Sequence, residues 1–120
     1  MSRIRYLLDE DTPHAIRDGL LLRQPQIEIL TVGDDFAPPL STPDPDILRW
    51  LAREGYLLVT RNRRTMPRHL RAHLDRGGHV PGILVIRPAR PMIEIINELM
   101  LIWEASHVEE YRDKIEYIPL

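Results

Sequence analysis

Three consecutive acidic residues, Asp9, Glu10 and Asp11, directly follow the first apolar run of the chain, residues 4–8. In α/β folds, ligands gather outside the carboxyl ends of parallel strands. A carboxylate at the end of a buried strand is also costly unless a cation or several hydrogen-bond donors compensate for its charge. This position favours a site role for Asp9, with Glu10 or Asp11 as a further ligand. Asp11 has the simpler alternative of helping Thr12 to cap the next helix.

Asp44 and Asn62 are the polar residues that the expected topology brings toward Asp9. Asp44 precedes a proline at the start of a predicted helix, and Asn62 follows the third predicted strand by two residues. The first and third strands of such a sheet are commonly neighbours and end at the same edge. Carboxylate and amide oxygens suit Mg²⁺ or Mn²⁺, cations that activate water and stabilise a phosphoryl transition state. We therefore predict a divalent-cation site at this edge, with the role of helix N-cap as the alternative for Asp44.

The elements that would position these residues alternate between apolar strands and amphipathic helices. Such alternation predicts an α/β fold, a three-layer α/β/α sandwich with a mainly parallel sheet of about five strands. A length of 120 residues predicts a single domain over residues 1–120. Strands are expected at residues 4–8, 27–32, 56–60, 83–86 and 115–118, and helices at residues 13–23, 45–54, 66–74 and 91–106.

The charge distribution is polarised, although the net charge is only −2. Residues 61–76 contain six arginines and two histidines against one acid, whereas residues 94–116 contain seven acids against one arginine and one lysine. A basic segment of this kind is typical of a surface that binds nucleic acid, with a solvated helix face as the alternative. The arginines predicted to contact nucleic acid are Arg61, Arg63, Arg64, Arg68 and Arg71.

Several other classes of protein find no support in the sequence. There are no cysteines, which excludes disulfides and thiolate metal sites. The apolar stretches are much shorter than the roughly 20 residues of a membrane span, and the first residues lack the pattern of a secretory signal, so we expect a cytoplasmic location. His69 and His73 are spaced as i and i+4, but with no third ligand nearby they are interpreted as a surface pair.

Three motifs, in order and with consistent spacing, resemble the short PIN-like domains. The family pattern is approximately L-L-D-E-N-x-(S/P), then D-x-E-I-L, then A-x-x-E-G-x-(V/I)-L-V-T-x-D-x-D-F. The corresponding segments here are LLDEDTP at residues 7–13, DPDIL at residues 44–48 and AREGYLLVTRN at residues 52–62. The resemblance covers about the first half of the chain, and the second half adds a consistent topology.

The resemblance implies a Mg²⁺- or Mn²⁺-dependent ribonuclease site, often found in the toxin of a bacterial toxin–antitoxin pair. Asp9 would be the first metal ligand and Asp44 or Asp46 the second acid, with Asn62 assisting. The implied partners are RNA and an antitoxin protein, and we also expect a homodimer.

The third motif departs from the family pattern, because Asn62 and Arg64 replace its two acids. Losing a carboxylate weakens a Mg²⁺ site, and a nearby arginine favours an ion pair with Asp9. Two hypotheses follow, a ribonuclease of reduced activity and a catalytically inactive PIN-like protein that binds RNA or a partner. A phosphoacceptor receiver domain is a third, but it requires an aspartate where strand three ends in Thr60 and Arg61.

Overall fold

Short apolar strands form the centre of the molecule. The computed structural model describes residues 4–120, in which five strands lie parallel in one sheet of order β2-β1-β3-β4-β5. β3 and β4 are buried along their whole length, as expected for strands covered on both faces. The strands are β1 (Tyr6–Leu8), β2 (Ile29–Thr31), β3 (Leu57–Thr60), β4 (Ile83–Ile86) and β5 (Ile115–Ile118).

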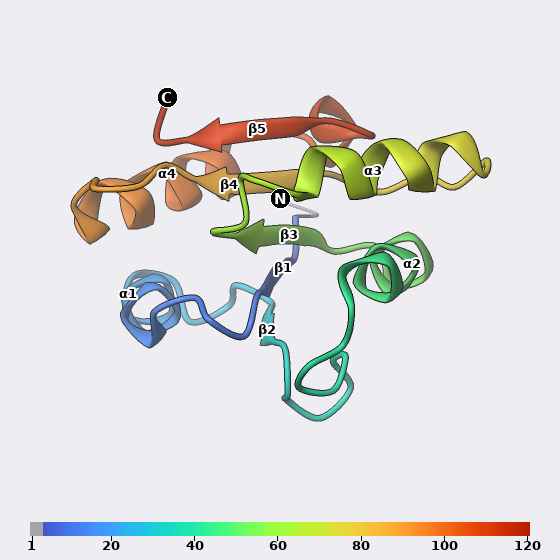
Figure 1. Cartoon of the computed structure of the whole chain (residues 1–120). Helices are drawn as coiled ribbons and strands as arrows, with labels where there is room; N and C mark the ends of the chain where they lie inside the picture. The colour runs from blue at the N-terminus through green and yellow to red at the C-terminus, as the bar shows by residue number, and fades with distance from the viewer. Residues whose placement is uncertain (1–3) are drawn as a thin grey trace.

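Helices cover both faces of this sheet (Figure 1). One apolar cluster joins α1 and α4 to the sheet, and another joins α2 and α3 to the opposite face. The helices are α1 (His14–Arg23), α2 (Asp44–Glu54), α3 (Met66–Asp75) and α4 (Met92–Ala105), and a short 3₁₀ helix, η1 (Val108–Tyr111), precedes β5. The predicted three-layer α/β/α fold is therefore confirmed.

The boundaries of several elements differ from those predicted. β1, β2 and β3 each begin later than the apolar runs that suggested them. α1 follows Pro13, and α2 follows Pro43, so the expected caps Thr12 and Asp44 are wrong by one residue. Neither helix has a side-chain cap, and the Asp44 carboxylate instead faces Asn62. Proline suits the start of a helix because its missing N–H would have no partner there.

The order of the strands brings β1 and β3 together at the centre of the sheet. From β1 the chain passes through α1 to β2 on one side, and β3 then pairs with β1 on the other side. Leu8, the last residue of β1, lies opposite Thr31 and Val59. The carboxyl ends of β1 and β3 therefore open at the point where ligands bind in open α/β sheets.

Within residues 4–120, none of the helices combines the length and the apolarity that crossing a membrane requires.

Candidate functional site

Asp9 lies at the carboxyl end of β1, next to the end of β3. One carboxylate oxygen, Oδ2, accepts a hydrogen bond from Thr60 Oγ1 at 2.7 Å, and Oδ1 accepts one from the Glu10 backbone N–H at 2.9 Å. Burial raises the pKa of Asp9, and the negative charges of Asp11 and Asp44 raise it further. These effects outweigh the two hydrogen bonds, which lower the pKa. Asp9 is therefore a carboxylate whose negative charge the fold disfavours.

A chain of hydrogen bonds connects Asp9 to the start of α2. Thr60 Oγ1 donates to Asp9 and accepts from the Asn62 backbone N–H at 3.1 Å. The Asn62 side-chain nitrogen then donates to Asp44 Oδ2 at 2.9 Å. We call Asp9, Thr60, Asn62 and Asp44 the acidic-edge network. The predicted convergence of β1, β3 and α2 is thus present in the structure.

The orientation of the Asn62 amide is determined by Thr65. Asn62 Oδ1 accepts from the Thr65 backbone N–H at 3.1 Å, and a backbone N–H can only donate. The amide nitrogen must then face the other way, where it donates to Asp44 and also to Thr65 Oγ1 at 2.7 Å. Asn62 therefore presents N–H groups, and not an oxygen, toward Asp44.

Two of the remaining predicted acids, Glu10 and Asp46, have other partners. Glu10 Oε1 accepts from the Ser41 backbone N–H at 2.7 Å, which fastens the loop between β2 and α2 to the end of β1. Asp46 is exposed and forms an ion pair with Arg49, three residues along its own helix. Both carboxylates are thus used in structural contacts outside the acidic-edge network.

The residues at this edge do not form a complete site for Mg²⁺ or Mn²⁺. Such ions require several oxygen ligands around one point. No group of three His, Cys, Asp or Glu side chains in the described part of the chain is arranged to hold a metal ion. The Asn62 amide also directs donors toward Asp44, where a cation needs acceptors.

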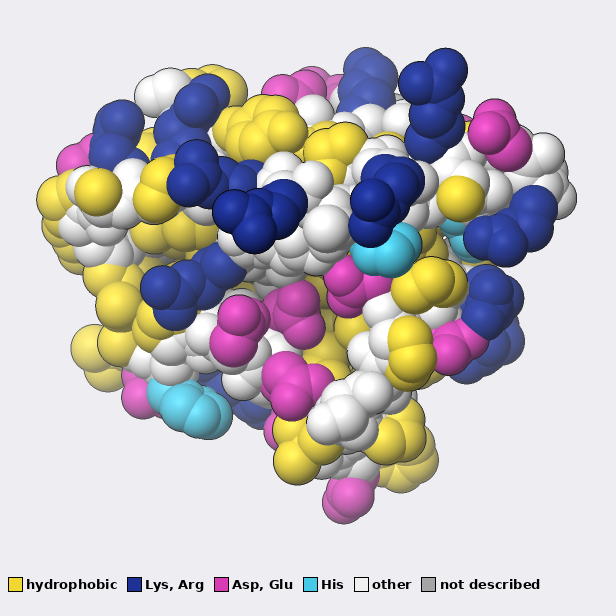
Figure 2. Space-filling view, viewed as in Figure 1, with side chains coloured by type: hydrophobic (Ala, Val, Ile, Leu, Met, Phe, Trp, Pro, Cys, Tyr) yellow, Lys and Arg dark blue, Asp and Glu magenta, His cyan; other side chains and the backbone are white. Residues whose placement is uncertain are grey.

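The predicted nucleic-acid-binding arginines lie beside this network. Arg61, Arg63, Arg64, Arg68 and Arg71 are all exposed. None of the ion pairs found between residues 4 and 120 includes any of them, so Asp9 does not form the ion pair with Arg61 or Arg64 that the alternative of a catalytically inactive binding protein suggested. Figure 2 shows basic side chains gathered above a group of acidic side chains on this face of the molecule.

Comparisons of the chain with protein-family models, curated proteins and solved structures find no match. The fold and the site define an α/β protein with an acidic network beside exposed arginines at the carboxyl edge of its sheet. The resemblance to PIN-like domains depends on the three sequence motifs.

Thr60 is the member of the acidic-edge network that sequence reasoning did not select. A threonine at the end of a buried strand usually attracts no functional interpretation, because threonine is common in strands. The feature that could have identified Thr60 is its position at the end of β3, directly before the loop that carries Asn62. β3 pairs with β1, the strand that leads to Asp9.

Replacing Asp9 with asparagine is expected to stabilise the protein at neutral pH by about 1 kcal/mol or less. A raised pKa in the folded state means that folding favours the protonated form of Asp9. The contribution of Asp9 to the free energy of unfolding is therefore largest below its unfolded pKa of about 3.9. That contribution is lost as the pH rises through the folded pKa. Asparagine removes the disfavoured charge, keeps one acceptor oxygen and replaces the other with an N–H donor.

Urea unfolding at pH 7 and at pH 3.5 checks this expectation, with Asp35→Asn as an exposed control from the neighbouring loop. The stabilisation by Asp9→Asn should be present at pH 7 and small at pH 3.5. A variant that is less stable than the wild type at pH 7 would contradict the argument.

Proposed function

We propose that this protein binds single-stranded RNA along the carboxyl edge of its sheet. The observation that carries the proposal is the set of exposed arginines after β3 and on α3, which form no ion pairs within the described residues. Arginines that are not neutralised by the protein are free to pair with phosphates. The net charge of −2 means that this attraction is local to one face.

The position of these arginines supports a strand of RNA as the ligand. Arg61, Arg63 and Arg64 follow β3, and Arg68 and Arg71 continue along α3, so the charges extend over two consecutive segments. The repeated phosphates of an RNA backbone match such an extended series of arginines, whereas a single small anion would contact only one or two of them. The resemblance to PIN-like domains also favours RNA.

The triple variant Arg63→Gln, Arg64→Gln, Arg68→Gln is expected to bind RNA about 10- to 100-fold more weakly than the wild type. Each lost phosphate contact should also reduce the salt dependence of the affinity, for a total change in slope of about 2 for single-stranded RNA. Fluorescence anisotropy with a labelled single-stranded RNA, in EDTA and over a range of salt concentrations, measures both quantities.

The matched control removes three arginines that already have partners. Arg53 and Arg112 form ion pairs with Glu54 and Asp113, and Arg23 donates to Asn97. Replacing these three with glutamine changes the net charge by the same amount and should leave RNA binding nearly unchanged. Equal losses in the two triple variants would show that total charge, and not this face, determines binding.

A second candidate is the Mg²⁺- or Mn²⁺-dependent ribonuclease that the PIN-like motifs imply. The supporting observation is the raised pKa of Asp9, which burial and the charges of Asp11 and Asp44 produce. A divalent cation would relieve that repulsion. Incubation of the same RNA with Mn²⁺, Mg²⁺ or EDTA tests this candidate, beside an Asp9→Ala variant of confirmed fold. Metal-dependent cleavage that the variant lacks would establish the nuclease, and cleavage no greater than that of the variant would leave RNA binding as the function.

A further inference from the structure

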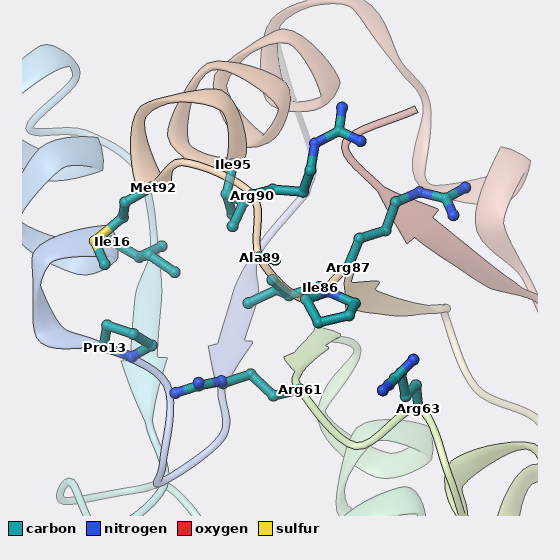
Figure 3. A pocket seen from close by; sticks show the side chains of 11 residues that line it. Pro13, Ile16, Arg61, Arg63, Ile86, Arg87, Ala89, Arg90, Met92 and Ile95 are labelled. Atoms are coloured by element: carbon teal, nitrogen blue, oxygen red, sulfur yellow. The ribbon is translucent and has the colours of Figure 1, made fainter.

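A cavity of about 320 Å³ lies between α1, the start of α4 and the segment that follows β3. Its floor is apolar, formed by the buried side chains Ile16, Ile86 and Ile95, with Pro13 and Met92 beside them (Figure 3). The volume lies at the lower end of the range of roughly 300–1,000 Å³ that is typical of small-molecule sites. We call this hollow the arginine-rimmed pocket.

The rim of the pocket carries four arginines, which differ in their partners. Arg87 Nε donates to the Pro119 carbonyl oxygen at 2.8 Å, and Arg90 pairs with Glu94 at 3.2 Å. Arg61 and Arg63 have no acidic partner within residues 4–120. Arg87 also has no acidic partner there, because Pro119 offers only an uncharged carbonyl oxygen. The pocket therefore combines an apolar floor with three guanidinium groups whose charge no described acid neutralises, and two of them, Arg61 and Arg63, come from the loop after β3.

Arg61 is oriented along one side of the pocket. Its Nη1 donates to the Asp11 carbonyl oxygen at 3.4 Å, and Figure 3 shows the side chain extended toward Pro13. A guanidinium group held beside an apolar floor leaves a slot suited to a flat ring, because aromatic rings stack favourably on arginine and bury their faces against apolar side chains. Arg63, from the same loop, is then available to pair with an anionic group of the molecule that carries the ring.

We infer that the arginine-rimmed pocket binds one nucleotide, with the base between Arg61 and the apolar floor and the phosphate on Arg63. A base supplies the flat ring, and a phosphate supplies the anion that Arg63 can pair with. Neither an apolar ligand nor a simple anion would use both halves of this pocket. That the nucleotide belongs to an RNA strand rests on the proposed function.

The pocket adjoins the acidic-edge network along the chain, because Arg61 lies between the network residues Thr60 and Asn62. Asp11 accepts the hydrogen bond from Arg61, and Pro13 lines the pocket two residues later. An RNA strand with one nucleotide in the pocket would continue past Arg63 and Arg64, in the loop after β3, toward the arginines of α3. The pocket thus fixes one base, while the arginines after β3 and on α3 hold the backbone.

AMP, adenosine and inorganic phosphate, each titrated into the ¹⁵N-labelled protein and followed by NMR, test this inference. AMP should shift the amide signals of Ala89 and Met92 and bind about tenfold more tightly than adenosine or phosphate alone. Met92→Glu places a carboxylate beside the apolar floor and should weaken AMP and adenosine about tenfold. Arg63→Gln should weaken AMP without changing adenosine.

The matched control for Met92→Glu is Ile93→Glu. Ile93 is the next residue of α4, is 50% exposed and does not line the pocket, so the same new charge there should leave AMP binding nearly unchanged. Arg61→Gln is a second pocket variant from an exposed loop position, and it should weaken AMP and adenosine even if Met92→Glu fails to fold.

The outcomes separate this inference from the proposed function. Binding of AMP that is equal in Met92→Glu, Arg61→Gln and the wild type overturns the pocket assignment, as does phosphate binding as tight as AMP binding. RNA binding that depends on Arg64 and Arg68 without any AMP binding overturns the inference and leaves the proposed function intact. AMP binding at the pocket without RNA binding supports the inference, assigns the pocket to a free nucleotide and overturns the proposed function. Displacement of labelled RNA by AMP supports both.

Discussion

Replacing Asn62 with aspartate is expected to destabilise the metal-free protein by about 1–3 kcal/mol and to make its stability depend on Mn²⁺. The wild-type amide donates to Asp44 and to Thr65 Oγ1, and an aspartate loses both donors. The new charge would also lie next to Asp44, in a region where carboxylates already repel one another. Without a cation, the variant therefore has a third acid and fewer hydrogen bonds.

Manganese should reverse this loss, because the substitution also converts a donor into an acceptor. Asp9, Asp44 and the new carboxylate would then provide three acidic ligands at the ends of β1 and β3 and the start of α2. A cation that binds only the folded state stabilises it by about 2.7 kcal/mol at a concentration 100 times its dissociation constant. Thermal unfolding in EDTA and in increasing Mn²⁺ measures the effect as a rise in Tm.

The control for this experiment is Asn62→Ala, which removes the same two donor bonds, and also the acceptor of the Thr65 N–H, without adding a charge. It should also be less stable than the wild type, but Mn²⁺ should not restore its Tm. If Mn²⁺ stabilises the wild type as strongly as Asn62→Asp, then the natural residues already hold the cation, and the conclusion that Asn62 leaves the site incomplete is wrong.

The fold could be predicted from the sequence because its strongest signals are local. β4 is apolar at every position and β3 at every position except its last, Thr60, and the helices α2 and α3 have clear amphipathic patterns. This combination leaves few arrangements other than a parallel sheet covered on both faces. The strand ends were less predictable, since an apolar residue such as Ile27 can be buried although it lies outside the strand, which begins at Ile29.

The site was predictable where it depends on topology and unpredictable where it depends on side-chain orientation. The meeting of Asp9, Asp44 and Asn62 follows from the adjacency of β1 and β3. The direction of the Asn62 amide depends on Thr65, and the Glu10 carboxylate is bound by the backbone N–H of Ser41, a loop residue 31 positions away. Such contacts between loops leave no periodic pattern in the sequence.

The sequence did not predict a role for Arg87 and Arg90, two of the arginines on the rim of the pocket. They lie in the loop between β4 and α4, outside the basic segment that drew attention to residues 61–76. Arg87 follows β4 directly, as Arg61 follows β3, and both strands end at the same edge of the sheet. That equivalence was the signal that could have identified Arg87.

Replacing Gly82 with alanine is expected to reduce the free energy of unfolding by about 3–5 kcal/mol, through backbone strain and overpacking together. Gly82 has a φ of +155°, a conformation that L residues rarely adopt. An added Cβ would lie 2.5 Å from Tyr111 Cβ and 2.8 Å from the Tyr111 carbonyl oxygen. Urea unfolding of the variant and the wild type measures the loss.

Tyr111 cannot easily move away, because contacts on both sides hold it. Its hydroxyl donates to Ser106 Oγ at 3.0 Å, and its carbonyl oxygen accepts from the Lys114 N–H at 3.0 Å, in the turn that leads into β5.

Gly77→Ala is the matched control, since Gly77 also has a positive φ, +82°, but no atom lies within 4 Å of its added Cβ. Strain alone should cost that variant about 1–2 kcal/mol. Equal losses in the two variants would mean that Tyr111 and the β5 edge yield to the new methyl group. A larger loss of stability in Gly82→Ala than in Gly77→Ala would show that η1 packs closely against the residue before β4 and cannot yield. This packing would then help to hold β4, whose last residue, Ile86, forms part of the pocket floor.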